Sequence, residues 1–175
     1  MSEVSTQTCT NCGEPVVTEM RNYQYSECGI SNVVLTGIQV ADCPNCGNTD
    51  VIIPHMARIH RAIAHALANS PARLTGEQLR FLRKRLGFTG EDLGTYLHTD
   101  KTKVSKWERD EDRIGPATDR LVRLLVAALD KDLRPALPAV AGHLPQISDD
   151  AGADYQLQVD SQTLQTAFLR VLRAA

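Results

Sequence analysis

The stretch "LHTDKTKVSKWER" (residues 97–109) gathers three lysines around Trp107, which is the only tryptophan of the chain. Asp100 is a favourable N-cap for a helix that begins at Lys101. At about 100° per residue, Val104 and Trp107 lie about 60° apart on such a helix, and the basic side chains lie on the opposite side. We therefore expect a short helix that buries its indole ring and turns its positive charges outward.

A second helix precedes this one at the spacing of a helix-turn-helix motif. Thr89 is placed to cap it, with Asp92 at its third helical position, and the helix is expected to end near Leu97. Gly94 supplies the small residue that a close helix crossing requires. A helix that enters the DNA major groove presents short polar and basic side chains in this way. The alternative is a helical bundle whose charges only interact with solvent.

The neighbouring sequence predicts four or five short helices over residues 74–130. Thr75 and Gln78 form a capping box at the start of the first of them, and Gly87 ends it. Pro116 is expected at the first position of the last helix. The predicted apolar face of that last helix consists of Leu121, Leu124, Leu125 and Ala128.

Cysteines characterise the first fifty residues. Four of the five form two C-x2-C pairs, and a glycine directly follows each pair. Two such pairs can supply four sulfur ligands to one tetrahedral zinc ion, which leaves no open position for water and makes the site structural. A redox dithiol and an iron–sulfur cluster are the alternatives. The expected ligands of a structural Zn2+ are Cys9, Cys12, Cys43 and Cys46.

The fifth cysteine and the histidines are expected to have no metal role. Cys28 lies between the two pairs, and we interpret it as a spare thiol on a loop, with redox sensing as the alternative. His55, His60 and His65 are spaced five residues apart in a predicted helix. This spacing does not place them on one face, so we expect no second metal site.

The predicted organisation is mainly α, with a small β zinc-binding domain. Residues 1–70 form the zinc-binding domain with a trailing helix over 54–70, whose inward face includes Met56, Ile59 and Ile63. Residues 71–130 form the helix-turn-helix domain, after a linker at 69–72. Residues 131–175 form a C-terminal extension of open role. In it, "DYQLQVD" alternates like a strand, and residues 161–175 are expected to form an amphipathic helix with Leu164, Phe168, Val171 and Leu172 inward.

Charge is unevenly distributed along the chain. The formal net charge is −2, yet residues 79–109 hold eight basic and four acidic residues, which gives that segment +4. A basic segment within an acidic chain indicates a polyanionic partner at one place. The N-terminus lacks a basic segment followed by an apolar one, and no apolar run is long enough to span a membrane. We therefore expect a cytoplasmic protein.

The segment "LRKRLGFTGEDLGTYLHTDKTKVSKWER" resembles the XRE/Cro-type helix-turn-helix. Together with the cysteine spacing and "LTGI" before the second pair, it is similar to MqsA-type antitoxins, which combine a YgiT-type zinc finger with this motif. The resemblance covers roughly residues 9–130. It implies a homodimer that represses its own operon at a palindromic operator, and a zinc domain that neutralises a ribonuclease toxin in a type II toxin-antitoxin system. Gly90 stands where the wider family often has a DNA-contacting glutamine.

The function expected from the sequence is that of a DNA-binding transcriptional repressor and antitoxin. The alternative is a stand-alone zinc-containing helix-turn-helix transcription factor without a toxin. The chain lacks the H-x-E signature of zinc deaminases, a G-x-S-x-G element and a phosphate-binding loop, so we do not expect an enzyme. The predicted DNA contacts are Thr89, Lys101, Thr102, Lys103, Ser105, Lys106 and Arg109.

Overall fold

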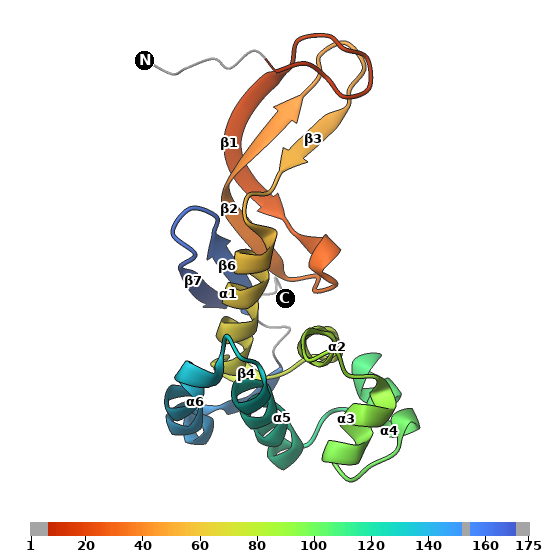
Figure 1. Ribbon diagram of the computed structural model, residues 1–175, viewed down its shortest axis with the longest axis vertical. Helices are drawn as coiled ribbons and strands as arrows, with labels where there is room; N and C mark the ends of the chain where they lie inside the picture. Colours follow the sequence, from red (N-terminus) through yellow and green to blue (C-terminus); the bar gives the residue numbers. More distant parts are fainter. Residues whose placement is uncertain (1–6, 152–154, 171–175) are drawn as a thin grey trace, which may run out of the picture.

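The computed structural model describes residues 7–151 and 155–170. A β finger lies at one end of its long axis, and a group of helices lies at the other end (Figure 1). Helix α1 (Met56–Ala68) runs between the two ends. Helices account for 43% of the residues and strands for 24%, so the fold is mixed and not clearly mainly α.

The N-terminal sheet is built around β2 (Val33–Asp42). One edge of β2 pairs antiparallel with β1 (Val17–Gln24). The other edge changes partner along its length: residues 39–42 pair with β3 (Thr49–Ile52), and residues 33–36 pair in parallel with β6 (Tyr155–Asp160). Gly37 lies at the change with φ +67°. Its carbonyl accepts a hydrogen bond from the hydroxyl of Ser161 at 2.6 Å, which ties the C-terminal segment to this point.

Residues 155–160 and 166–170, near the C-terminus, add two strands to this sheet. The predicted strand "DYQLQVD" is confirmed as β6, but the predicted helix over 161–175 is wrong for 166–170, where β7 (Thr166–Arg170) pairs antiparallel with β6. Leu164 and Phe168 do pack against the core, as parts of a hairpin. Val171 and Leu172 lie outside the described residues. Pairing with an available sheet edge has outweighed the helical spacing of the apolar residues.

Helix α1 carries the main core between the two ends. Ile59, Ile63 and Leu67 are fully buried and belong to one continuous cluster with residues of β2 and β6. Met56, in the first turn, is 49% exposed, so the buried face begins one turn later than expected. The helix contacts α2, α5, β6 and β7. It therefore joins the sheet to the helical end through buried apolar surface.

The helical end shows the predicted capping. The hydroxyl of Thr75 accepts from the backbone amide of Gln78 at 3.3 Å. The side-chain oxygen Oε1 of Gln78 accepts from the backbone amide of Thr75 at 3.1 Å. Thr89 and Asp92 make the equivalent capping box, and Asp100 accepts from the amide three residues ahead. These caps fix where each helix begins. The four helices are α2 (Gly76–Arg85), α3 (Gly90–Tyr96), α4 (Lys101–Glu108) and α5 (Pro116–Leu129).

The remaining short elements lie between β1 and β2, between α1 and α2, or after α5 in the sequence. β4 and β5 pair in parallel with each other in a separate two-stranded sheet. Among the described residues, no helix is both long and apolar enough to cross a bilayer. These remaining elements are η1 (Ser26–Cys28), β4 (Ala72–Arg73), η2 (Arg134–Ala136), α6 (Leu137–His143), η3 (Leu144–Gln146) and β5 (Ser148–Ala151).

Two glycines allow the helices to approach α4 closely. A Cβ on Gly94 would lie 2.6 Å from the carbonyl oxygen of Thr99, in the turn between α3 and α4. A Cβ on Gly76 would lie 2.7 Å from the carbonyl carbon of Glu108, at the end of α4. Both obstacles are backbone atoms, which cannot move aside as a flexible side chain would. Gly94 therefore has the packing role that the sequence predicts for it.

Gly76→Ala is expected to destabilise the protein by about 1–3 kcal/mol, because the added methyl group overlaps the backbone of α4. Gly90→Ala is the matched control. Each glycine is the first residue of its helix, but a Cβ on Gly90 would meet nothing closer than the Cβ of Lys101 at 4.0 Å. Urea unfolding of both variants measures the difference. Equal unfolding midpoints would contradict the proposed contact between α2 and α4.

The inward face of α5 differs from the prediction. Leu121 is 41% exposed, and Leu124, Leu125 and Ala128 are only partly buried. The helix is rotated so that Arg123 points inward with no exposed surface. The residues that α5 buries are Asp119, Val122, Arg123, Val126 and Ala127.

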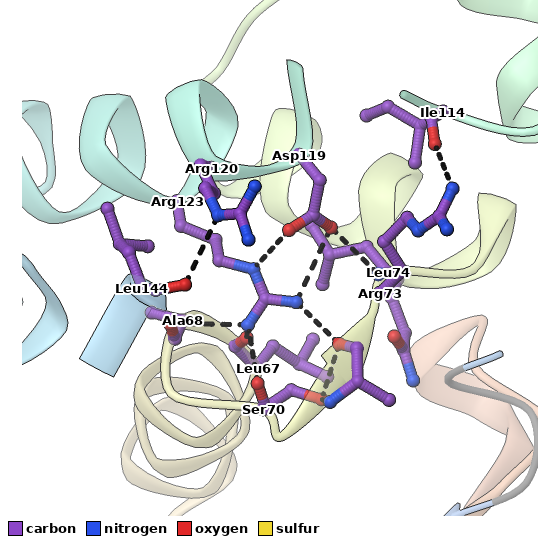
Figure 2. A network of polar contacts seen from close by, with 12 residues as sticks. Leu67, Ala68, Ser70, Arg73, Leu74, Ile114, Asp119, Arg120, Arg123 and Leu144 are labelled. Atoms are coloured by element: carbon purple, nitrogen blue, oxygen red, sulfur yellow. Dashed lines mark hydrogen bonds and ion pairs between the residues drawn. The ribbon is translucent and has the colours of Figure 1, made fainter. Parts of the chain in front are cut away.

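A network of polar contacts explains this rotation (Figure 2). The Nε of Arg123 donates to the Oδ2 of Asp119 at 2.8 Å, and Oδ1 of Asp119 accepts from the amide of Leu74 at 2.8 Å. The other guanidinium nitrogens donate to backbone carbonyls of the segment expected to be a linker, at 2.9 Å for Ser70 and 2.6 Å for Ala72. Both of those residues are buried. The segment at 69–72 breaks the helical pattern, as predicted, but it is a buried connection.

Candidate metal centre and nucleic-acid interface

The four predicted metal ligands meet at the tip of the finger. The sulfur atoms of Cys9, Cys12, Cys43 and Cys46 all lie within 4.8 Å of one another. Across the two pairs, Sγ of Cys9 lies 3.6 Å from Sγ of Cys46, and Sγ of Cys12 lies 3.5 Å from Sγ of Cys43. The first cysteine of each pair is buried and the second is exposed. Sequence spacing alone had predicted this convergence, and the structure confirms it.

Two similar tight turns present these sulfur atoms. The amide of Gly13 donates to the carbonyl of Cys9 at 2.9 Å, and the amide of Gly47 donates to the carbonyl of Cys43 at 3.0 Å. Both glycines have positive φ, +77° and +70°, which a side chain would oppose. Each turn therefore holds its two thiols on the same side, and the finger brings the two turns face to face.

Two asparagines add a layer that the sequence analysis did not identify. Asn11 and Asn45 occupy the same position in "CTNCG" and "CPNCG". The side-chain amide of Asn11 donates to Sγ of Cys46 at 3.7 Å, and that of Asn45 donates to Sγ of Cys12 at 3.7 Å. Each amide thus crosses to a sulfur of the opposite turn. Donors of this kind stabilise thiolates, and the matching position in the two motifs could have indicated them.

The thiol pKa values shift in opposite directions within the cluster. The amide of Asn48, followed by the side chain of Asn11, lowers the pKa of Cys46 to about 6. The amide of Cys46 lowers the pKa of Cys43, but burial and the adjacent thiols raise it, to a net value of about 11. Thiols this close share protons, and a bound cation displaces those protons. The donor set therefore fits a single metal ion that is surrounded by four sulfur atoms.

Helix α4 has the predicted division into a buried and an exposed side. Val104 is 1% exposed and Trp107 is 8% exposed, and both belong to the core. Ser105 is partly buried at the edge of the exposed side. The predicted DNA contacts that lie exposed on or next to this helix are Lys101, Thr102, Lys103, Lys106 and Arg109.

Acidic side chains form ion pairs with two of the exposed cations. Lys103 forms an ion pair with Asp112, and Arg109 forms one with Glu111, at 2.6 Å from Nε to Oε1. Both acids lie in the loop that directly follows α4, and the sequence analysis did not include this loop in its charge count. In the part of the chain that the structure describes, Lys101 and Lys106 form no ion pair. Hydrogen bonds from Arg109 and Lys103 lower the pKa of Glu111 and Asp112, respectively, and Lys106 nevertheless lies near enough for its charge to lower the pKa of both carboxylates further.

Glu108 anchors the end of α4 to α2. This carboxylate is 8% exposed, and it accepts from Nε of Arg83 at 2.5 Å and from Nε of Arg80 at 3.3 Å. Burial raises the pKa of Glu108, but the two arginines outweigh burial, so its pKa is lowered. Arg80 and Arg83, which belong to the basic segment, therefore fix the orientation of α4. They do not add charge to its exposed side.

Thr89 lies exposed at the start of α3, but its polar groups already have partners. Its amide donates to Oδ2 of Asp92 at 2.7 Å, and its hydroxyl contacts the same carboxylate. The carboxylate of Asp92 has a lowered pKa because the Thr89 hydroxyl and amide both donate to it. A contact from Thr89 to a polyanion would have to replace these bonds.

Cys28 lies outside the metal centre. Its thiol donates to the carbonyl of Tyr25 at 3.1 Å, and burial raises its pKa. A raised pKa leaves less of the reactive thiolate, which agrees with the interpretation as a spare thiol. His60 makes a 2.8 Å hydrogen bond through Nε2 to the hydroxyl of Tyr25, so it has a structural contact that its spacing in the sequence did not predict.

Comparison with known proteins gives no match: no family model, no curated protein and no solved structure corresponds to this chain.

Proposed function

We propose that the protein is a sequence-specific DNA-binding transcriptional repressor that reads its operator with α4. The observation that carries this proposal is the two-sided character of the helix, whose indole is buried and whose lysines and threonine face solvent. The caps, the close approach at Gly94 and the Glu108 anchor hold this surface in a fixed orientation. A rigid helix with short polar residues near its start suits insertion into a major groove.

The exposed side chains divide into two roles in this proposal. Thr102, Ser105 and Lys106 face the base edges, where they contact donors and acceptors in the groove. Lys101, Lys103 and Arg109 contact phosphates, and Thr89 lies at the edge of the same surface. Binding then exchanges the carboxylates of Glu111 and Asp112 for DNA phosphates. These carboxylates lower the net attraction for any polyanion, so base contacts count for more in the total affinity.

Lys106→Ala is expected to weaken binding to operator DNA by about 5- to 150-fold, because a base-reading contact contributes about 1–3 kcal/mol. The side chain is exposed and forms no ion pair within the described residues, so the fold should be unaffected. Lys131→Ala removes an exposed lysine outside α4 and serves as the control. Gel-shift titration with DNA from upstream of the protein's own gene measures the effect. Unchanged affinity in Lys106→Ala would reject this use of α4.

The four-cysteine site is proposed to hold a structural Zn2+ ion. A zinc ion with Zn–S bonds of about 2.3 Å places its ligands about 3.8 Å apart, close to the sulfur separations of 3.5 and 3.6 Å. The four sulfurs complete a tetrahedral shell and leave no position for a substrate. The ion would therefore stabilise the tip of the finger and take no part in a reaction.

The antitoxin role is the finer part of the proposal, and it rests on the resemblance to MqsA-type antitoxins. In this role the protein is a cytoplasmic homodimer whose two α4 helices lie about 34 Å apart on a palindrome. Its zinc domain neutralises a ribonuclease-type toxin. Co-expression with the product of the adjacent gene tests this directly, by rescue of growth and by co-purification. A protein that binds DNA but captures no such partner would be a stand-alone transcription factor.

A further inference from the structure

A cavity of about 350 Å³ lies between η1, α1 and α2, away from both the cysteine cluster and the exposed side of α4. It is lined by one thiol, one glycine, two rings and three cations, and none of its lining residues is acidic. This volume is at the lower end of the range found for small-molecule sites. The lining residues are Cys28, Gly29, His60, Arg80, Phe81, Lys84 and Arg85.

Stacked rings give the cavity a flat and rigid wall. The ring of His60 stacks on Tyr25 with centroids 5.9 Å apart, and it meets Phe81 edge to face at 5.8 Å. Tyr25 is 2% exposed and its hydroxyl bonds to Nε2 of His60, so the imidazole is held in place. Burial, followed by the charge of Arg85, lowers the pKa of His60, which favours the neutral ring. A neutral, fixed ring suits contact with a planar apolar group.

Lys84 supplies the uncompensated charge at this wall. Arg80 is paired with Glu108, and Arg85 is paired with Asp130 and Asp132. Lys84 is exposed and forms no ion pair in the described part of the chain. A single available ammonium beside two aromatic rings is a recognition pattern for a molecule with one anionic group and one flat apolar body.

We propose that this cavity binds a small organic anion that has an aromatic or similarly planar body. The planar body of the ligand lies with the rings of His60 and Phe81 on one side and Cys28 on the other. The carboxylate or phosphate of the ligand faces Lys84. The size of the cavity excludes a folded partner or a nucleic-acid strand as its occupant. It also accounts for a half-buried thiol and a neutral histidine that the metal centre and α4 do not use.

The position of the cavity connects the ligand to α4, a consequence that rests on the proposed function. Cys28, Gly29 and His60 come from the sheet end, whereas the cations come from α2 at the helical end. Arg80 is shared between the cavity and Glu108 of α4. An anion that attracts Arg80 weakens its pair with Glu108, so we expect ligand binding to lower DNA affinity at least about fivefold. By thermodynamic linkage, DNA lowers ligand affinity by the same factor.

The test titrates the full-length protein with benzoate, phenyl phosphate and uncharged benzyl alcohol, and follows the histidine ring signals by NMR in the absence of DNA. We expect saturable shifts of the His60 signals with one or both anions and none with benzyl alcohol. Lys84→Glu should weaken the anion at least about tenfold, because it replaces a charge-assisted contact with repulsion. Lys131→Glu makes the same change of net charge outside the cavity and should leave affinity unchanged.

Shifts with benzyl alcohol equal to those with the anions would overturn the assignment, as would equal weakening by Lys84→Glu and Lys131→Glu. The tighter of the two anions identifies the preferred acidic group. DNA affinity is then measured with the cavity saturated by that anion. Equal DNA affinity with and without the anion would reject the coupling to α4. A protein that binds the anion but no DNA would instead contradict the proposed function.

Discussion

Removal of the metal ion is expected to unfold the tip of the finger and to leave the helical end folded. Between residues 7 and 16, Cys9 alone is buried, and between residues 43 and 52 Cys43 alone is buried. Apart from the cysteines, the two turns are joined by polar contacts, such as the hydroxyl of Thr10 to the carboxylate of Asp50 at 2.9 Å. There is too little apolar surface at the tip to offset the entropy of ordering it. The proposed metal ion would therefore supply the folding energy of the tip through its bonds to the four sulfur atoms.

Cys43→Ser is expected to abolish metal binding at the proposed site, because a hydroxyl replaces one of the two buried thiols. Zinc binding of this kind contributes about 10–16 kcal/mol of apparent free energy, so the effect should exceed that of any other substitution in the sheet. Metal analysis of the purified protein should give about one ion per chain for the wild type and almost none for the variant. Limited proteolysis should then cut within 7–16 and 43–52, and the helical end should remain protected.

Cys28→Ser is the matched control for this experiment. It removes the one cysteine whose thiol lies outside the cluster, and it should keep both the metal and the protease resistance of the tip. A wild-type protein that contains no metal but has a reducible disulfide would contradict the metal site and favour a redox dithiol. Absorption in the visible range with bound iron would indicate a cluster on the same ligands.

The local elements could be predicted because their determinants lie close together in the sequence. The capping boxes at Thr75 and Thr89 and the N-cap at Asp100 depend on residues three apart, and all three occur as predicted. The cysteine site needed only the spacing within each pair, because each tight turn holds its own two sulfurs. The burial of Trp107 followed from helix periodicity alone. For the caps and the indole, one segment contains all the information, and for the cysteine site two short segments with the same spacing do.

Features that depend on distant partners were not predictable in this way. Residues 166–170 are spaced like a helix, but β6 finds a free edge on β2, more than a hundred residues earlier, and β7 then pairs with β6. The acidic loop after α4 neutralises Lys103 and Arg109, although its residues directly follow the helix. The sequence does not show that they fold back onto it. The rotation of α5 is a third such feature, because periodicity assigns a charged residue to the exposed side.

Arg123→Met is expected to destabilise the protein by about 3–5 kcal/mol, although it replaces a charged side chain with an apolar one of similar length. The guanidinium has no exposed surface and donates to carbonyls on the connection between α1 and α2. Burial lowers the pKa of Arg123, but Asp119 opposes this effect, and arginine stays charged. Removal of the side chain leaves the buried carboxylate of Asp119 without its opposite charge, with the amide of Leu74 still donating to it. It also takes from the carbonyl of Ser70 the donor that the described residues supply to it. Urea denaturation measures the loss.

The double variant Asp119→Leu/Arg123→Met separates the ion pair from the rest of the network. A buried ion pair that bonds to no other group could be replaced by apolar residues with little loss in the free energy of unfolding. Here the double variant should remain destabilised, because the carbonyl of Ser70 and the amide of Leu74 still lose their partners (Figure 2). Each unsatisfied buried group costs about 1–3 kcal/mol.

Arg120→Met, on the same helix, is the control for this pair of variants. Within the described residues, the side chain of Arg120 donates one hydrogen bond, from Nε to the carbonyl of Leu144 at 3.2 Å, and it is only partly buried. Its loss should cost no more than about 1 kcal/mol. If the double variant regained wild-type stability, the carbonyl contacts would contribute little, and the ion pair alone would account for the buried arginine. If the double variant stays unstable, the connection at 69–72 orients α5. Its backbone carbonyls then hold the Arg123 side of the helix inward instead of the predicted leucine side.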